Sequence, residues 1–149
     1  MELKIKALSP KIGTEIPAPK FATPGSAAMD LCACIDEDVT IAAGCRAIIP
    51  TGLAIALPCA DFVALICARS GLASKFGITM ANGVGVIDSD YRGELKVALH
   101  NSSDTDYTIH SGDRIAQLMI VPVLRPDLRV VDTLPETERG AGGFGSTGR

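Results

Sequence analysis

The chain has 149 residues, 47% of them hydrophobic, and a formal net charge of −3 at pH 7. This length predicts one domain that buries about two-thirds of the surface of its unfolded chain. The acidic balance argues against binding of nucleic acid through a basic surface. Any phosphate ligand must therefore be held by a few local cations, by backbone N–H groups or by a metal ion.

Two stretches bear on targeting. The N-terminal stretch from Met1 to Lys6 alternates charged with aliphatic side chains and contains no apolar core of signal-peptide length. The charge-free run between Arg46 and Asp61 is interrupted by prolines and is too short to span a bilayer. The sequence therefore predicts a soluble, cytoplasmic protein that has neither a membrane nor a nucleic acid as a partner.

Short apolar runs predict strands along most of the chain. Leu3, Ile5 and Ala7 alternate with lysines, which predicts a half-buried first strand. A proline-rich stretch at 9–26 predicts an extended connection with little regular structure. Further strands are predicted at 39–42, 46–49, 53–57, 62–67, 95–100, 107–109, 114–121 and 128–133. Strands of this length, separated by turn residues, are typical of an all-β sandwich or barrel.

One short helix interrupts the strands, at 70–77. Ser70 is a candidate N-cap, and Gly77 is a candidate C-terminal stop. Arg69 stands where the preceding strand meets this helix, and a helix N-terminus offers free N–H groups and positive potential. The residues alone favour equally a cradle for an oligophosphate and a routine capped turn at the surface.

The stretch from Asn82 to Glu94 holds two carboxylates, Asp88 and Asp90, directly after Val86 and Ile87. Apolar residues that enter a glycine-bounded turn predict a strand that runs into a hairpin. A carboxylate on a rigid turn beside apolar neighbours can act as a general base, because partial desolvation raises its proton affinity. The alternative is a solvated hairpin tip in which Asp, Ser and Gly only form the turn.

Other polar residues have plainer interpretations. Gln117 lies in an otherwise apolar strand, so it is either a hydrogen-bonded core residue or a ligand contact. His100 and His110 are predicted at the surface, near strand ends. The cysteines are predicted to be reduced, small core residues rather than metal ligands. They are Cys32, Cys34, Cys45, Cys59 and Cys67.

The composition changes after Pro135, where the chain becomes rich in glycine. Gly140, Gly142 and Gly145 match the spacing of a dinucleotide-binding loop, but no strand precedes them and no helix follows, so a Rossmann site is excluded. The segment offers closely spaced N–H groups, hydroxyls and arginines, which bind phosphate. A merely disordered terminus is the alternative.

Five of these blocks, taken in order, resemble the pattern of the trimeric dUTPase (dUTP pyrophosphatase) family. The blocks are Pro24 to Leu31, Arg69 to Ala73, Asn82 to Glu94, Gly112 to Leu118 and Arg139 to Gly148. One departure is Ala28, which stands where the family usually has Gly; this costs something if that position needs an unusual backbone angle.

The resemblance implies an all-β fold, a distorted jelly-roll-like barrel or sandwich with one short helix. Residues 1–135 would form the domain, and residues 136–149 a flexible arm that closes over the active site. Three chains would form a homotrimer with active sites at the subunit interfaces. The implied reaction is hydrolysis of dUTP to dUMP and pyrophosphate by attack of water on the α-phosphorus. It would limit uracil incorporation into DNA and supply dUMP for thymidylate synthesis.

The resemblance also assigns residue roles. Asp88 would be the general base, Tyr91 would lie against the deoxyribose, and Phe144 would stack on the uracil. Asp30 would support Mg²⁺ through its water shell, with the metal ion itself on the triphosphate. The full set implied to bind substrate is Arg69, Ser70, Gly71, Asn82, Val86, Ile87, Asp88, Tyr91, Lys96, Gln117, Arg139, Phe144, Gly145, Ser146 and Thr147.

Ordering about ten arm residues costs on the order of 10 kcal/mol of backbone entropy, which phosphate bonds and one stacked ring nearly offset. We therefore expect an arm that is loose without ligand and ordered with it. Two further functions compete with the triphosphatase. A dCTP deaminase shares the fold but would need a deaminating acid–base pair and usually a longer chain. A nucleotide-sensing binding protein that has lost its chemistry is the other.

Overall fold

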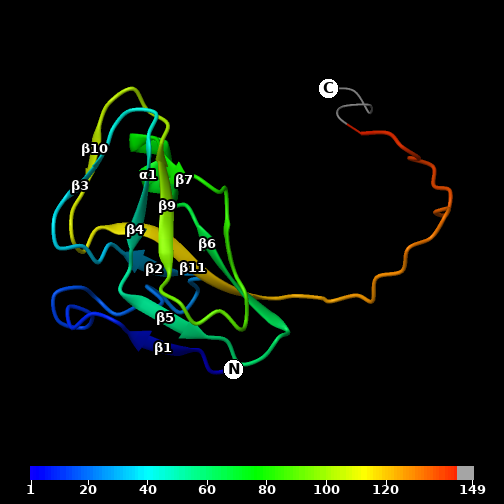
Figure 1. Cartoon of the computed structure of the whole chain (residues 1–149), viewed down its shortest axis with the longest axis horizontal. Coiled ribbons are helices and arrows are strands. Elements are labelled where there is room, and N and C mark those ends of the chain that lie inside the picture. The colour runs from blue at the N-terminus through cyan, green and yellow to red at the C-terminus, as the bar shows by residue number, and fades with distance from the viewer. Residues whose placement is uncertain (144–149) are drawn as a thin grey trace.

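The computed structural model describes residues 1–143, and among them it contains short strands and a single short helix (Figure 1). In chain order the elements are β1 (Lys4–Ala7), β2 (Met29–Cys32), β3 (Val39–Ile41), β4 (Arg46–Pro50), β5 (Leu53–Ala56), β6 (Phe62–Cys67), α1 (Ser70–Phe76), β7 (Ile78–Met80), β8 (Gly85–Ile87), β9 (Lys96–Asn101), β10 (Tyr107–Ile109) and β11 (Arg114–Pro122). The predicted all-β class is confirmed.

All strand pairs are antiparallel, and they form four separate sheets. The largest has the order β2-β11-β6-β8, and a second has the order β4-β9-β7. Two-stranded sheets, β1-β5 and β10-β3, lie at the periphery. The sheets within residues 1–143 keep open edges, so the arrangement is jelly-roll-like rather than a closed barrel.

The core between the sheets is aliphatic. Leu31, Ile66 and Leu118 come from three neighbouring strands of the largest sheet and are at most 1% exposed. Val97 and Leu99 of β9 face them from the second sheet and are equally buried. The alternation of buried and half-exposed residues along β6 and β9 follows the period-2 geometry of a strand with one face in the core.

The polar groups enclosed by this core are satisfied. Asn101 is fully buried at the end of β9; its Nδ2 donates to the carbonyls of Ile41 and Thr105 at 2.9 and 2.7 Å. Its Oδ1 accepts from the N–H and the hydroxyl of Ser103 at 3.0 and 2.7 Å. One side chain thus ties together β3, β9 and the turn before β10, because a buried amide is stable only when its hydrogen bonds are made.

Three local predictions were wrong. The first strand is exposed along its whole length rather than half-buried, because β1 pairs only with β5 at the periphery. Residues 128–133 form no strand. The predicted hairpin at 82–94 does not form either: β8 pairs with β6 and β9 pairs with β4 and β7, so the chain crosses between two sheets there.

The cysteine prediction holds only in part. All five thiols are free, as expected. Cys32 is buried, but Cys34 and Cys67 are half-buried, and Cys45 and Cys59 are exposed. Cys45 and Cys59 lie in the connections before β4 and β6. They are therefore outside the strands whose inward faces form the core.

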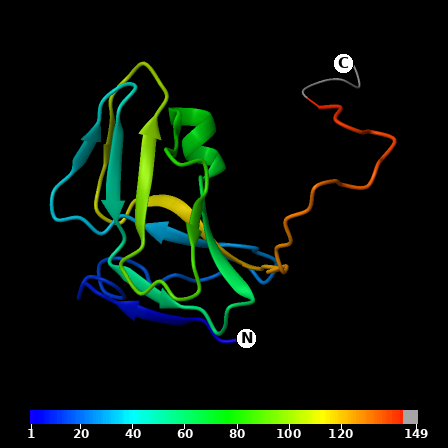
Figure 2. The same cartoon turned by 45° about the vertical axis from the view of Figure 1, so that its right-hand side comes forward.

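Beyond β11 the chain leaves the domain, and both views show residues 123–143 running away from it (Figure 1, Figure 2). Leu124, Leu128 and Val130 on this segment are each more than 90% exposed. These three side chains therefore have no apolar partner on the domain of their own chain. No helix in the described part of the chain has the length and apolar character needed to cross a bilayer.

Candidate active site

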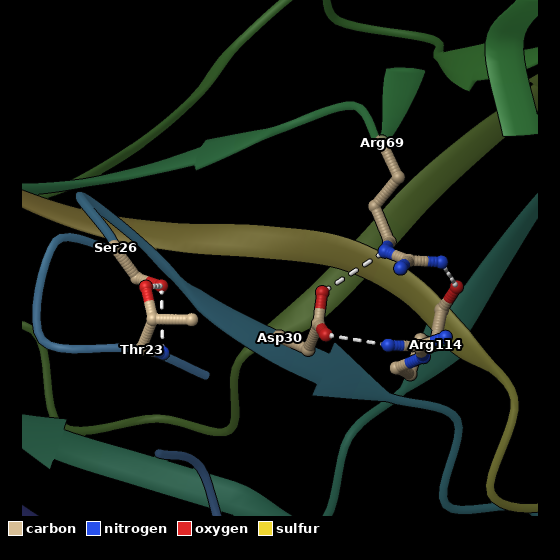
Figure 3. A network of polar contacts seen from close by, with 5 residues as sticks. All are labelled: Thr23, Ser26, Asp30, Arg69 and Arg114. Carbon is tan, nitrogen blue, oxygen red and sulfur yellow. Dashed lines mark hydrogen bonds and ion pairs between the residues drawn. The ribbon is translucent and has the colours of Figure 1, made fainter. Parts of the chain in front are cut away.

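A polar cluster lies on the largest sheet, where β2, β11 and the end of β6 meet (Figure 3). The Nε of Arg69 donates to Oδ1 of Asp30 at 2.9 Å, and a guanidinium nitrogen of Arg114 donates to Oδ2 of Asp30 at 3.3 Å. Arg69 also donates to the main-chain carbonyl of Arg114 at 3.2 Å. One carboxylate thus orients two arginines, and the cluster carries net positive charge.

The strand register explains why these residues meet. Gln117 of β11 lies opposite Asp30 on one side and opposite Cys67 on the other. Residues directly opposite each other in a sheet project from the same face. Asp30, Gln117 and Cys67 therefore form a row across three strands, and Arg69 follows Cys67 by two residues. Gln117 is half-buried on this face rather than enclosed in the core.

Sequence reasoning missed Arg114 as a site residue. It begins β11 and lies opposite Cys32 in the register with β2, next to a bulge in the pairing. In the sequence, Arg114 is recognisable only as a basic residue at the start of an apolar strand. It indicates a site only when β2, which carries Asp30, is known to pair with β11.

The environment of Cys32 follows from the same register. Burial raises the pKa of the Cys32 thiol, and the nearby Asp30 carboxylate acts in the same direction. The thiol therefore stays neutral beside the arginines.

The helix α1 begins directly beside this cluster. Arg69 is its N-cap residue with extended backbone angles and no side-chain cap, so the prediction that Ser70 is the N-cap was wrong. Ser70 is instead the first helical residue, and its carbonyl accepts from the hydroxyl of Ser74 at 2.7 Å. Ser70 and Gly71 are exposed, and a Cβ at Gly71 would meet nothing within 4 Å. A ligand can approach this backbone closely. The C-terminal stop at Gly77 is confirmed, with φ of 68°.

A second group of predicted residues lies on the turn that follows β8. The N–H of Tyr91 donates to the carbonyl of Asp88 at 3.1 Å, and the Tyr91 hydroxyl donates to the carbonyl of Glu94 at 3.0 Å. A Cβ at Gly93 would lie 2.6 Å from Cζ of Tyr91, so glycine is needed for the ring to keep this position. Asp88 is exposed, and the single chain does not supply the desolvation expected of a base there.

The structure keeps these two groups apart. Ile87, next to Asp88, lies opposite Ala64 at the start of β6, whereas Arg69 follows the far end of that strand. At about 3.3 Å per extended residue, Asp88 and Arg69 are separated by roughly 20 Å along the strand direction. Asp88 and Tyr91 therefore belong to one surface region, and Asp30, Arg69, Ser70 and Gln117 to another.

The other predicted substrate contacts are also distributed. Asn82 and Val86 are exposed and Ile87 is half-buried, all close to the Asp88 turn. Lys96 opens β9 and lies 3.9 Å from Oε2 of Glu94, an ion pair at the surface. Arg139 is on the arm, where its Nε donates to the carbonyl of Gly142 at 2.9 Å. The predicted contacts Phe144, Gly145, Ser146 and Thr147 lie outside the described residues.

The cluster around Asp30 is better suited to a magnesium ion that is coordinated by the phosphates of a ligand than to one coordinated only by protein side chains. Asp30 is a single carboxylate, and both of its oxygens already accept from arginines. Residues 1–143 contain no group of three or more His, Cys, Asp or Glu arranged to hold a metal. Mg²⁺ commonly keeps several waters and binds through one or two carboxylates together with substrate phosphates. Asp30 can serve such an ion through its water shell.

Together, the open jelly-roll-like sheets and the arginine–carboxylate cluster define an all-β protein with a positively charged surface site suited to an anion. A family model described as dUTPase matches residues 14–148. The deoxyuridine 5'-triphosphate nucleotidohydrolase of Tolumonas auensis is 49% identical over 148 residues, which cover 99% of this chain and 98% of the relative. That of a Psychrobacter species is 50% identical over 150 residues, covering 99% and 97%.

Solved structures agree with these relatives. A mutant dUTPase of Staphylococcus bacteriophage 80alpha with dUpNHpp superposes with a TM-score of 0.86 at 28% identity, over 99% of both chains. A mutant dUTPase from phage phi11 of S. aureus, described with a structural Mg(II) ion, has a TM-score of 0.78 at 25% identity, over 91% of this chain and all of that one. The chain belongs to the dUTPase family.

Proposed function

We propose that this chain is a dUTP diphosphatase that hydrolyses dUTP to dUMP and pyrophosphate. The observation that carries the proposal is the dUTPase family match over residues 14–148. A cytoplasmic location, a role in limiting uracil incorporation into DNA and a role in supplying dUMP for thymidylate synthesis are parts of the same proposal. The cluster of two arginines around Asp30 supports it, because a chain of net charge −3 needs such a local concentration of cations to hold a triphosphate.

Arg69, Ser70, Gly71 and Gln117 hold the phosphates in this proposal. Arg69 supplies a planar donor fork suited to phosphate oxygens. The accessible first turn of α1 supplies N–H groups, and Gln117 supplies an amide from the same sheet face. Asp30 faces Mg²⁺ through water, and when bound the ion would neutralise charge on the phosphates.

Asp88 accepts the proton from the attacking water. The oxygen of that water forms a bond to the α-phosphorus, and the bond from this phosphorus to the bridging oxygen breaks, so that pyrophosphate leaves. Tyr91 is held by its hydrogen bond to the Glu94 carbonyl in a place where its ring can lie against the deoxyribose. The backbone at Asn82 and Val86–Asp88 binds the edge of uracil in this proposal.

A complete site requires more than one chain in this proposal. Asp88 lies about 20 Å along the strand direction from Arg69 of the same chain. Between them, the outer face of the sheet carries a row of apolar side chains, Met119, Leu65 and Val86, which the register places opposite one another. Val86 is 62% exposed. A second copy that covers this face would bring its own Asp88 turn to the phosphate cluster, as expected for a homotrimer with sites at subunit interfaces.

The arm completes the site from residue 136 onward. Among residues 1–143 the Arg139 side chain hydrogen-bonds only within its own turn, so it is available to close over the outer phosphates together with Ser146 and Thr147, while Phe144 stacks on the uracil and Gly145 also binds substrate. An arm that follows a loosely attached, exposed segment can act as a lid.

The experiment that tests the function is pyrophosphate release from dUTP, UTP, dTTP and dCTP, each with Mg²⁺ and with a chelator. We expect release from dUTP alone, and a lower rate with chelator. Equal release from UTP would contradict the role of Tyr91. Binding of dUTP without release would favour a nucleotide-sensing protein.

A further inference from the structure

A lysine outside the five family-like blocks lies beside the polar cluster. Phe21 forms an isolated antiparallel bridge with Met29. Lys20 directly precedes Phe21 and Asp30 directly follows Met29, so in the antiparallel arrangement the two residues flank this bridge on the same side. Lys20 therefore lies near the end of the row formed by Asp30, Gln117 and Cys67.

The surface around Lys20 is hollowed. Lys20, Ser26, Asp30 and Gln117 line a hollow of about 250 Å³ together with alanines at 22, 27 and 28. Lys20 and Asp30 also line a neighbouring hollow of about 320 Å³, in which Arg114 takes part. Lys20 therefore shares one space with Asp30 and Gln117, and small side chains leave room there for a ligand.

Asp30 has paired cations on one side, Arg69 and Arg114, and on the other Lys20, a cation that is unpaired within residues 1–143. Figure 3 shows Asp30 between the arginines and the loop that carries Thr23 and Ser26. The Ser26 hydroxyl accepts from the Thr23 N–H at 3.0 Å, and this bond fixes the loop. Both arginines are engaged with Asp30, whereas Lys20 has no ion pair among the described residues. The exposed ammonium is the cation on the Ser26 side that is available to an anion.

We propose that Lys20 is a further phosphate-binding residue of this site, and that its ammonium contacts the outer phosphates of dUTP, those that leave as pyrophosphate. The inference rests on the proposed function. Arg69 and the start of α1 lie at one end of the row and Lys20 at the other. When a triphosphate lies along this row with its inner phosphate near Arg69, its outer phosphates reach Lys20. A lysine acts there as a mobile point charge rather than as a bidentate fork.

The test compares Lys20→Ala, Lys20→Arg and the wild-type chain, with Lys6→Ala as the matched control. Lys6 is an exposed lysine on β1, in a different sheet. We expect Lys20→Ala to raise KM for dUTP about tenfold, the loss of one charge-assisted hydrogen bond at an exposed position. Inhibition by pyrophosphate should weaken by a similar factor. Inhibition by dUMP, which lacks the outer phosphates, and kcat should change less than about threefold.

Lys20→Arg should restore most of the affinity, and the difference between wild type and Lys20→Ala should shrink as salt is added. If Lys20→Ala had the same KM for dUTP as Lys6→Ala, the inference would be overturned. So would an equal weakening of dUMP inhibition, since Lys20 would then act on the whole site. If the wild-type chain releases no pyrophosphate, the proposed function fails instead. Calorimetric titration with pyrophosphate and Mg²⁺ then decides the inference, and equal binding by wild type and Lys20→Ala overturns it.

Discussion

At the scale of the residue, the carboxylate of Asp88 has a fixed position in the single chain but no neighbours among residues 1–143 that shield it from solvent. Its carboxylate sits on a turn fixed by the Tyr91 N–H, yet it is exposed to solvent. A carboxylate becomes an effective base when burial and neighbours raise its proton affinity. In the proposed function those neighbours would come from the substrate and from another copy of the chain.

Replacement of Asp88 tests its role directly. We expect Asp88→Asn to keep dUTP binding within a few-fold and to lower kcat by about 10²–10⁴, the usual contribution of a positioned base. Asp90→Asn removes the same charge two residues away, so the larger loss must fall on Asp88 if proton transfer, and not the local field, is responsible. Single-turnover rates and equilibrium binding of dUTP separate the two effects. Loss of binding along with turnover in Asp88→Asn would contradict the assignment.

The thiols give a second prediction at this scale. Cys32 is 7% exposed and burial raises the pKa of its thiol, so at pH 8 it should be mostly protonated and react slowly with iodoacetamide. Cys45 and Cys59 are exposed and should react before Cys32. The rate at Cys32 should rise as the pH is raised above the range of an ordinary thiol, because only the thiolate reacts. Peptide mass spectrometry follows each site, with the chain in denaturant as the reference. Equal rates for Cys32 and Cys59 in the folded protein would refute this.

At the scale of the element, β9 shows how one strand organises its surroundings. It pairs with β4 on one side and β7 on the other, and its inward residues fill the core. Its last residue, Asn101, then fastens the small β10-β3 sheet through side-chain hydrogen bonds. The sheet β10-β3 contributes Ile41 and Ile109 to the core, and the hydrogen bonds of Asn101 add a polar attachment to this packing.

Removal of the Asn101 amide should therefore be costly. We expect Asn101→Ala to lower the free energy of unfolding by at least about 2 kcal/mol, because each buried polar group left unpaired costs about 1–3 kcal/mol. Thr40→Ala is the matched control, since it removes only the solvent-exposed hydroxyl contact between Thr40 and Thr108. Its effect should stay within about 0.5 kcal/mol. Urea unfolding at a fixed protein concentration measures both. Equal stabilities for the two variants would show that the Asn101 network contributes nothing.

At the scale of the whole molecule, the two groups of site residues lie on the same sheet but at opposite ends of β6. The order β2-β11-β6-β8 places the phosphate cluster near one edge and the Asp88 turn beyond the other. A sheet cannot fold back on itself, so in the proposed function these groups would meet between copies of the chain. The segment between β11 and the arm also carries exposed apolar residues away from its own domain, and a neighbouring copy would cover them in the proposed assembly.

Complementation tests this arrangement. Asp88→Asn and Arg69→Ala chains should each be nearly inactive alone. Unfolded together in equal amounts and refolded, they should recover about one quarter of wild-type activity. Each site then draws an intact Arg69 from one chain with a chance of about one half and an intact Asp88 from its neighbour with a chance of about one half. Refolding the two separately and mixing them without exchange is the control. No recovery after co-refolding would place the whole site within one chain.

The sequence by itself determined the local features of this protein. Short apolar runs at 62–67 and 114–121 predicted β6 and most of β11, and Gly77 marked the end of α1, because these depend on backbone conformation and on neighbours nearby in the chain. The resemblance of ordered blocks predicted the family. Only the tertiary structure decided the long-range pairings. It assigned β8 and β9 to different sheets, brought Arg114 and Lys20 to Asp30, and separated Asp88 from Arg69. The physical reason is that the partner and register of a strand are chosen by the packing of residues far apart in the chain, which no local pattern encodes.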